Sequence, residues 1–330
     1  MSKQRPHVTI VTPVYNGGAY IAECIESVIA QHYANWQYII VNNCSSDNTL
    51  ALATRYAEKD DRIRIVTNTT FVGVIENHNI AFQQLAPESR YCKLVSADDW
   101  IYPECLDQLV DVAEKHPSAG IVGSYSTTGK DIAPRDIPLR DEVFSGQSIC
   151  RMHLLGKQVF SALTASLFRA DLIRGKKAFL TVAAPNADTH EFLKVLQHHD
   201  YGFVHQILSF VRVHDQSVSG KLMKFNSFLV NRIEYLVTYG SLYLSPHEYE
   251  NRRTELLAIY YGFLADRTLR FAGNEFWEYH RRRMTELGHP ISHVRLAGAV
   301  CSKIVDLVGN PKQTIETALR RLRRVERPGE

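Results

Sequence analysis

Several features that would place this chain in a special class of protein are missing. Its 330 residues contain no apolar run of the roughly 20 residues that a membrane-spanning helix requires. The nearest candidate, residues 296–309, is shorter, carries Lys303 and Asp306, and is typical of a packed helix. No secretory signal pattern precedes the first apolar run. We therefore expect a chain without a membrane span, located in the cytoplasm.

Cysteine clusters and a large net charge are also missing. The six cysteines are scattered without a CxxC pair, which fits reduced thiols better than disulfides or a zinc site. The 38 Lys and Arg residues nearly balance 35 Asp and Glu residues, and the net charge of +3 is too small to indicate nucleic acid as a partner. With 45% hydrophobic residues, the composition excludes disordered and collagen-like chains.

The first 125 residues alternate between strand and helix patterns. A β-branched run at 8–14 ends in a turn, and residues 21–29 place apolar side chains at helical spacing. Further strand candidates lie at 36–41, 63–66 and 91–95, with helical stretches between them. Alternation of this kind predicts an α/β fold, with a mostly parallel sheet flanked by helices.

Polar residues follow three of the predicted strands. Tyr15 follows the first strand, Asn42 and Asn43 follow the second, and Asp98 and Asp99 follow the fourth. In open α/β sheets, ligands bind outside the carboxyl ends of the strands, so we expect these residues to meet at one edge. The adjacent carboxylates suit a hard divalent cation. An alternative role is to cap the helix that follows them.

Six motifs, in this order, resemble the inverting nucleotide-sugar glycosyltransferases of the GT-A fold, glycosyltransferase family 2. They are TPVYNGGAYIAECIESVIAQ at 12–31, IIVNNCSSDNT at 39–49, GVIENHNIAF at 73–82, SADDWIYP at 96–103, NADTHEFLKVL at 186–196 and VRVHDQSVS at 211–219. The resemblance implies a Rossmann-like GT-A domain over residues 1–219. It does not cover residues 220–330, whose periodicity predicts a C-terminal helical region.

The resemblance implies a nucleotide-sugar site at the start of the chain. Pro13 and Tyr15 would flank the base, with the Tyr15 ring offering a stacking face. The alternative is an aromatic residue at a strand end that covers the core. Asn43 stands where the family commonly has an Asp that contacts the base edge. An Asn keeps the acceptor oxygen and adds donors, so the identity of the base stays open.

The resemblance also implies a divalent cation, Mn²⁺ or Mg²⁺. Asp99 would bind the cation directly, and Asp98 would contact the ribose or a metal-bound water. His214 resembles a family histidine near the diphosphate that is sometimes a further metal ligand. The alternative for His214 is a structural role in a turn. Ser96 stands where many members have one more Asp.

Asp188 aligns with the catalytic base of the family, although Ala187 replaces the commoner Glu before it. Its position also suits a helix N-cap, and both roles are compatible. Glu191, one turn later, is the second candidate for the base. The implied reaction is a single inverting displacement in which Asp188 takes the proton of an acceptor hydroxyl. The metal would stabilise the departing nucleoside diphosphate.

These residues predict a metal-dependent inverting glycosyltransferase. It would transfer a sugar from a nucleotide-diphosphate sugar to a hydroxyl of a glycan or lipid-linked acceptor, in surface polysaccharide or glycolipid biosynthesis. The alternative is a non-catalytic nucleotide-sugar or glycan-binding module, because Asn42, Asn43 and Ser96 replace acids. A dinucleotide-dependent oxidoreductase is disfavoured, since NGGAYI does not match GxGxxG.

The C-terminal segment, residues 314–330, is basic and amphipathic. Ile315, Leu319 and Leu322 share one face, and five arginines surround it. Such a helix can lie on anionic lipid, which predicts peripheral contact with the inner face of a membrane. A helix docked on its own domain is the ordinary alternative. Whether this region dimerises is open at this point.

Overall fold

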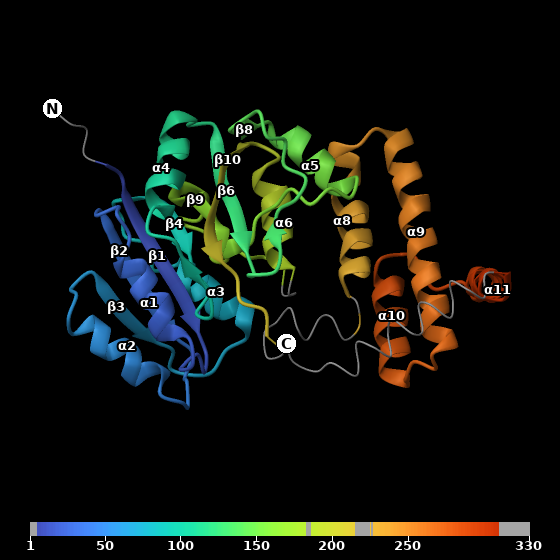
Figure 1. Cartoon of the computed structure of the whole chain (residues 1–330), viewed down its shortest axis with the longest axis horizontal. Coiled ribbons are helices and arrows are strands. Elements are labelled where there is room, and N and C mark those ends of the chain that lie inside the picture. The colour runs from blue at the N-terminus through green and yellow to red at the C-terminus, as the bar shows by residue number, and fades with distance from the viewer. Residues whose placement is uncertain (1–4, 183–185, 215–224, 226, 310–330) are drawn as a thin grey trace. The chain divides into compact units, whose positions relative to one another are not determined.

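The computed structural model describes residues 5–182, 186–214, 225 and 227–309. By its internal contacts the chain divides into two compact units, residues 1–221 and 222–330. In Figure 1 the first unit runs from blue to yellow and the second from orange to red. Each unit is described by itself below.

The first unit is built on a ten-stranded sheet with the order β3-β2-β1-β4-β9-β6-β10-β5, to which β7 and β8 add at β6 and β10. Six strands run in one direction: β1 (His7–Val14), β2 (Trp36–Asn42), β3 (Ile63–Thr67), β4 (Ser89–Leu94), β6 (Ala119–Thr127) and β10 (Asp200–Phe210). Four run in the opposite direction: β5 (Trp100–Ile101), β7 (Ile132–Ala133), β8 (Val143–Phe144) and β9 (Ser166–Arg169). The predicted mostly parallel α/β sheet is confirmed.

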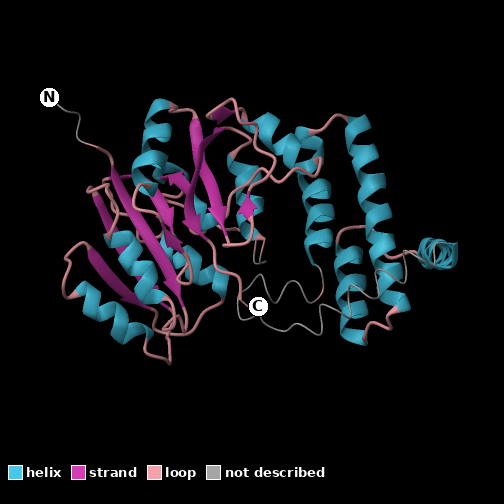
Figure 2. Ribbon diagram, in the orientation of Figure 1, coloured by secondary structure: helices cyan, strands magenta, loops and turns pink. Residues whose placement is uncertain are grey.

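Helices cover both faces of this sheet (Figure 2). They are α1 (Ile21–Ile29), α2 (Thr49–Ala57), α3 (Val74–Phe82), α4 (Cys105–Lys115), α5 (Gly146–Leu154) and α6 (Ala187–Val195), with short 3₁₀ turns η1 (Leu163–Ala165) and η2 (Ala170–Leu172). On one face, α1 and α4 bury their apolar sides against the strands in a single core cluster. On the other face, Phe82, Phe168 and Phe192 belong to a chain of edge-to-face aromatic contacts. Burial on both faces explains why the strands read as continuous apolar runs.

The direction of the strands decides where the polar residues meet. Because β1, β2, β4 and β10 are parallel, the segments that follow them leave the sheet at the same edge. Those segments begin at Tyr15, Asn43, Val95 and Val211. The reversed strand β9 separates β4 from β6 and leaves this arrangement intact.

The second unit consists of helices in its described part: α8 (Ser227–Tyr243), α9 (Pro246–Leu269), α10 (Asn274–Glu286) and α11 (His293–Gly309). The start of α9 has a capping box, in which Ser245 and Glu248 exchange side-chain to backbone hydrogen bonds. Within the described residues, no helix is both long and apolar enough to cross a membrane. All six cysteines are free.

Candidate active site

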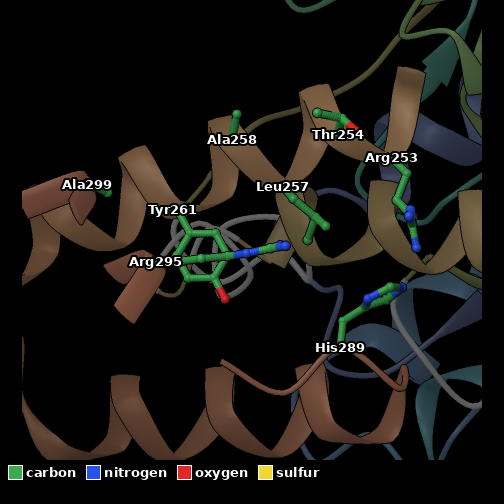
Figure 3. A pocket seen from close by; sticks show the side chains of 8 residues that line it. All are labelled: Arg253, Thr254, Leu257, Ala258, Tyr261, His289, Arg295 and Ala299. Atoms are coloured by element: carbon green, nitrogen blue, oxygen red, sulfur yellow. The ribbon is translucent and has the colours of Figure 1, made fainter. Parts of the chain in front are cut away.

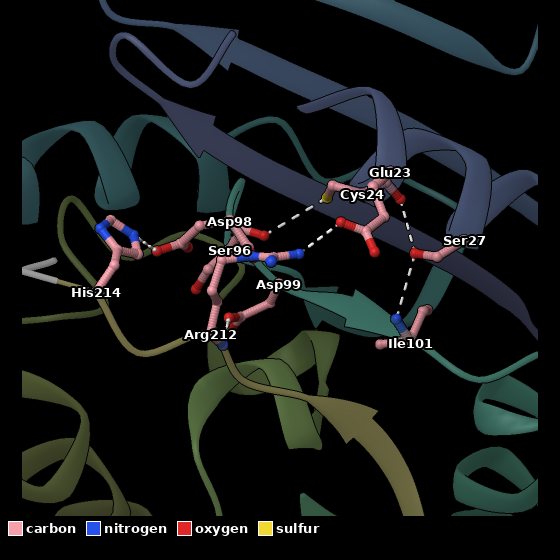
Figure 4. A network of polar contacts seen from close by, with 9 residues as sticks. All are labelled: Glu23, Cys24, Ser27, Ser96, Asp98, Asp99, Ile101, Arg212 and His214. Carbon is pink, nitrogen blue, oxygen red and sulfur yellow. Dashed lines mark hydrogen bonds and ion pairs between the residues drawn. The ribbon is translucent and has the colours of Figure 1, made fainter. Parts of the chain in front are cut away.

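The Asp98–Asp99 pair lies in the turn between β4 and β5, and Asp99 is only 5% exposed. The turn is closed by a hydrogen bond from the Asp99 amide to the Ser96 carbonyl, 3.0 Å long. The Asp99 carboxylate accepts from the Thr164 hydroxyl at 2.5 Å and from the Arg212 amide at 2.9 Å. Asp99 is therefore held by η1, which precedes β9, and by the segment that follows β10; Figure 4 shows Asp99 beside Arg212 of that second segment.

The protonation of Asp99 is displaced from its ordinary range. Burial raises the pKa of Asp99 to about 7, and the negative charge of Asp98 adds to the rise. The hydrogen bonds from Thr164 and Arg212 oppose the rise without cancelling it. Two acids this close, with one of them buried, form a place where a bound cation would relieve electrostatic repulsion.

His214 lies beside Asp98, as Figure 4 shows. Its Nε2 is 3.0 Å from Oδ2 of Asp98, and its ring is tilted against the Tyr20 ring at a centroid distance of 5.4 Å. Both side chains of the pair keep partial exposure, 24% for His214 and 30% for Asp98. The structure thus brings His214 to the predicted pair Asp98 and Asp99, although it lies 116 positions after Asp98 in the sequence.

Arg212 is a residue of this site that sequence reasoning did not single out. Its Nε donates to the Asp98 carbonyl at 3.0 Å, and its guanidinium pairs with Glu23 and lies 4.6 Å from the centre of the Tyr20 ring. Arg212 therefore connects the segment after β10 both to the Asp98–Asp99 turn, which we call the acid turn, and to α1. The only signal in the sequence is its place two residues before His214.

These residues fit a divalent cation that is held jointly with a ligand. The carboxylates of Asp98 and Asp99 and the imidazole of His214 are suitable donor groups for Mn²⁺. In the described part of the chain, however, no group of three or more His, Cys, Asp and Glu residues is arranged as a metal cage. Mg²⁺-type sites commonly use one or two carboxylates and complete the sphere with substrate phosphates and water. The donor set matches that arrangement.

Two exposed aromatic residues lie at the same edge of the sheet. The Tyr15 ring is 51% exposed and meets the Phe71 ring, which is 60% exposed, edge to face at 4.7 Å. Pro13, by contrast, is buried in β1, where it is paired with Val41 of β2. Large exposed aromatic faces are apolar surface that a flat ligand can cover. Phe71 was not among the predicted residues.

Asn43 is buried, and its side chain is largely committed within the chain. Its amide group donates to the Val72 carbonyl at 2.8 Å, and its oxygen accepts from the Val72 amide at 3.0 Å. The same oxygen accepts from the Asn68 amide group at 2.9 Å. The oxygen has then used both acceptor sites, and one N–H donor remains. Asn43 therefore pins the backbone next to Phe71.

The two candidate bases lie on α6. Asp188 occupies the first turn, where its carboxylate accepts from the Thr189 amide at 2.7 Å, and burial raises its pKa. Glu191 is 3% exposed, burial raises its pKa as well, and Lys194 lies 3.4 Å away. Acids with raised pKa values are suited to accept protons near neutral pH.

Two cavities in the described part of the chain have other residues than the Asp98–Asp99 turn as their lining. A cavity of about 550 Å³ belongs to the second unit and is lined by α9, α11 and His289. Figure 3 shows Arg253 and His289 pointing toward each other across it. A cavity of about 350 Å³ lies at the amino end of β4, where Ser89 and Arg174 contribute to its wall. Neither is lined by a predicted site residue.

Comparison with known proteins identifies the family to which most of the first unit is similar. Residues 9–174, about half of the chain, match the family model "Glycosyl transferase family 2". An uncharacterized glycosyltransferase of Haemophilus influenzae is 26% identical over 57% of this chain and 59% of its own length. The Escherichia coli protein UDP-Glc:alpha-D-GlcNAc-diphosphoundecaprenol beta-1,3-glucosyltransferase WfgD is 29% identical over 39% of this chain. This chain spans 52% of WfgD, so it matches only part of these relatives.

Solved structures share the fold at low sequence identity. TarS of S. aureus, residues 1–349 with UDP-GlcNAc, superposes with a TM-score of 0.61 at 16% identity, over 96% of this chain and 92% of that 1–349 chain. The mannosyltransferase PcManGT of Pyrobaculum calidifontis, with GDP-Man and Mn²⁺, gives 0.56 at 16% identity, over 96% and 84% of the two chains. The likeness establishes the GT-A fold. With the family match over residues 9–174, the chain belongs to glycosyltransferase family 2.

Proposed function

We propose that this chain is a metal-dependent inverting glycosyltransferase whose donor is a nucleotide-diphosphate sugar. The observation that carries the proposal is the Asp98–Asp99 turn with His214, at the carboxyl edge of the sheet of a family 2 domain. Its acidic groups suit a cation that bridges to a diphosphate. TarS and PcManGT, which share the fold, are described with UDP-GlcNAc and with GDP-Man and Mn²⁺.

In this proposal each residue has a separate task. Tyr15 and Phe71 offer aromatic faces to the base, and Asn43 offers its remaining N–H donor. Asp99 and Asp98 would hold the cation, and His214, which lies beside Asp98, would be a further donor. When bound, the cation supplies Lewis-acid stabilisation of the negative charge on the diphosphate.

The acceptor hydroxyl needs a base, and we assign that role to Asp188. Desolvation raises the pKa of its half-buried carboxylate, so it keeps more proton affinity than an ordinary Asp. Transfer of the hydroxyl proton to Asp188, with attack on the anomeric carbon from the face opposite the diphosphate, inverts the configuration. Glu191, also on α6, is the second candidate for this proton transfer.

The acceptor is proposed to be a glycan or a lipid-linked glycan used in surface polysaccharide or glycolipid biosynthesis. WfgD, the relative named above, acts by its name on a diphosphoundecaprenol-linked sugar. An acceptor of that kind would place the chain in the cytoplasm, with peripheral contact at the inner face of the membrane. The basic segment 314–330 that predicts this contact lies outside the described residues.

Titration of the purified chain with nucleoside diphosphates tests the proposal. We expect UDP, GDP or dTDP to bind with Mn²⁺ present and to bind much more weakly after Mn²⁺ is chelated. The double variant Asp98→Asn/Asp99→Asn should lose the Mn²⁺-dependent part of the affinity while the fold, measured by circular dichroism, is kept. Nucleotide binding that is indifferent to Mn²⁺ and to both substitutions would contradict the proposal.

A non-catalytic nucleotide-sugar-binding module is the second candidate. The observation in its favour is that Asn43, at a position where the family commonly has an Asp, spends most of its hydrogen-bonding capacity inside the chain. Such a module would bind the donor without releasing nucleotide from it. Nucleotide release that disappears in Asp188→Asn, with donor binding retained, separates the enzyme from the module.

A further inference from the structure

Helix α11 is apolar and yet has no buried residue. It packs against α9. Its half-buried residues are Leu296, Ala299, Val300 and Lys303. Together they mark the side of the helix that faces its own unit, and Ala299 also lines the cavity of Figure 3. The sequence predicts a packed helix here, whereas the structure leaves most of its apolar side chains in water.

An exposed apolar stripe runs along α11 from the side opposite these half-buried residues toward their flank. Val294 is 84% exposed, Val308 is 75% exposed, and Cys301 lies midway between them, also exposed. These three residues are seven positions apart, and Ala297 and Ile304, each three positions later, are exposed too. We call these five residues the α11 stripe. Aliphatic side chains left in water forgo the favourable free energy of burial, so a partner that covers the stripe is favoured.

The spacing of the stripe is that of a coiled coil. Val294, Cys301 and Val308 occupy the first position of successive heptads, and Ala297 and Ile304 occupy the fourth. The next fourth position is Pro311, so the repeat covers two heptads of α11 and one further first position. Apolar residues at both positions are typical of helices that pair with other helices.

A lipid surface fits these observations less well. A helix lying on a flat bilayer keeps a period of 3.6, whereas a seven-residue repeat drifts by about 20° per heptad and calls for a partner that coils with it. Helix α11 contains no Trp, Tyr or Phe, which helices of the membrane interface commonly use. Within α11, Arg295 and Lys303 against Asp306 leave a net charge of only +1, a weak attraction for anionic lipid.

We propose that the α11 stripe is the contact surface for a second copy of this chain. The stripe carries no charge, so two copies meet without repulsion, and a two-fold axis lets the same surface serve both chains. In a parallel pair about a two-fold axis, the first-position residues of the two helices lie side by side, which places one Cys301 beside the other. Because α11 offers little more than two heptads, the association is expected to depend on protein concentration.

Sedimentation equilibrium of the full chain tests this proposal, because it measures the mass of the associating species in solution. The mass should rise with concentration from the 37.6 kDa of one chain toward twice that value. In the double variant Val294→Glu/Val308→Glu the mass should stay at that of one chain. Both side chains are exposed, so the added charges should change the stability of the monomer little. Ser302→Glu adds charge to an exposed position of the same helix outside the stripe, so this control should associate like the unaltered chain.

Cross-linking with a short bismaleimide provides a second readout that needs no charged variant. The linker should join two chains through Cys301, and the product should vanish in Cys301→Ser and in the double Glu variant. Flotation with vesicles containing phosphatidylglycerol covers the lipid alternative. The proposal is overturned if the chain stays monomeric at every concentration, or if the stripe substitutions abolish vesicle binding of a monomer without changing its mass. None of these measurements depends on the donor or acceptor of the proposed transferase.

Discussion

At the scale of single residues, the raised pKa of Asp99 is the clearest effect of burying a carboxyl group next to another negative charge. Its pKa of about 7 means that the carboxyl group is protonated, and therefore uncharged, in much of the chain below neutral pH. A cation at this site competes with that proton. We expect the affinity for Mn²⁺, measured by calorimetry with a nucleoside diphosphate present, to rise about tenfold per pH unit up to pH 7 and to level off above it.

The sign of this effect follows from the direction of the shift. A raised pKa extends the pH range in which Asp99 is protonated to higher pH. Acidification therefore lowers the affinity for the cation already at pH 6, where an ordinary Asp is ionised. In Asp99→Asn most of the affinity and this pH dependence should disappear together. An unaltered chain whose Mn²⁺ affinity is the same at pH 5.5 and pH 7.5 would contradict this account of Asp99.

Asn43 gives a second prediction at this scale. In Asn43→Asp the Val72 carbonyl loses its donor and faces a carboxylate oxygen, at a position that is 2% exposed. We expect the free energy of unfolding, measured in urea, to fall by about 1–3 kcal/mol. Asn35→Asp is the matched control, because Asn35 donates one bond to the Arg5 carbonyl at a half-buried position and the loss should be smaller. Equal losses in the two variants would refute the special role of Asn43.

Local sequence patterns predicted some of these residues and missed others for a physical reason. Asp98, Asp99 and His214 belong to motifs whose residue types already suggest acid and imidazole chemistry. Thr164 and Arg212 meet Asp99 across 65 and 113 positions of the chain. Thr164 acts through one hydroxyl and Arg212 through its backbone amide and its guanidinium, and such contacts leave no local pattern. Only the folded topology reveals them.

At the scale of elements, the segment after β10 is fastened to the acid turn by Arg212. In Arg212→Ala the backbone bond to Asp99 remains, but the Asp98 carbonyl and Glu23 lose their guanidinium partner. We expect Mn²⁺-dependent binding of nucleoside diphosphate to weaken on the order of tenfold, as for the loss of a charged hydrogen bond. Arg64→Ala, which removes an exposed arginine of the edge strand β3, is the control and should bind normally. Equal binding by both variants would mean that Arg212 does not position the turn.

Helix α6 carries both candidate bases, and the two can be told apart. Asp188→Asn should lower kcat for sugar transfer by a factor on the order of 10²–10⁴ while the donor still binds. In Glu191→Gln, where Lys194 loses its ionic partner, we expect lower stability and a smaller change in kcat. The reverse order of effects on kcat would move the catalytic role to Glu191.

The helices and strands themselves were largely predictable, and their surroundings were not. Apolar spacing predicted α1 at residues 21–29, and its inner residues are buried as the spacing implies. The same kind of spacing predicted a packed helix at 296–309, where the structure has the exposed helix α11. Periodicity identifies an apolar side, but whether that side meets its own chain, a partner or water depends on elements distant in the sequence.

At the scale of the whole molecule, topology gathers the candidate site. Six strands run in one direction, so residues from Tyr15 to His214 reach one edge of the sheet of the first unit. A net charge of +3 says nothing of this arrangement. The net charge is a sum over the whole chain, in which the negative charges of the acid turn are offset by basic residues such as the arginines of segment 314–330. The family assignment and the acid turn carry the functional proposal, and the composition only limits the class.

The most direct test of the central claim is nucleotide release from a panel of uridine, thymidine and guanosine diphosphate sugars in the presence of Mn²⁺. The account predicts that one donor releases its nucleoside diphosphate, that an acceptor glycan accelerates the release, and that Asp99→Asn and Asp188→Asn abolish it. Only Asp188→Asn should still bind the donor with Mn²⁺. Donor binding by the unaltered chain without release from any sugar, with or without acceptor, would contradict the account and favour a binding module.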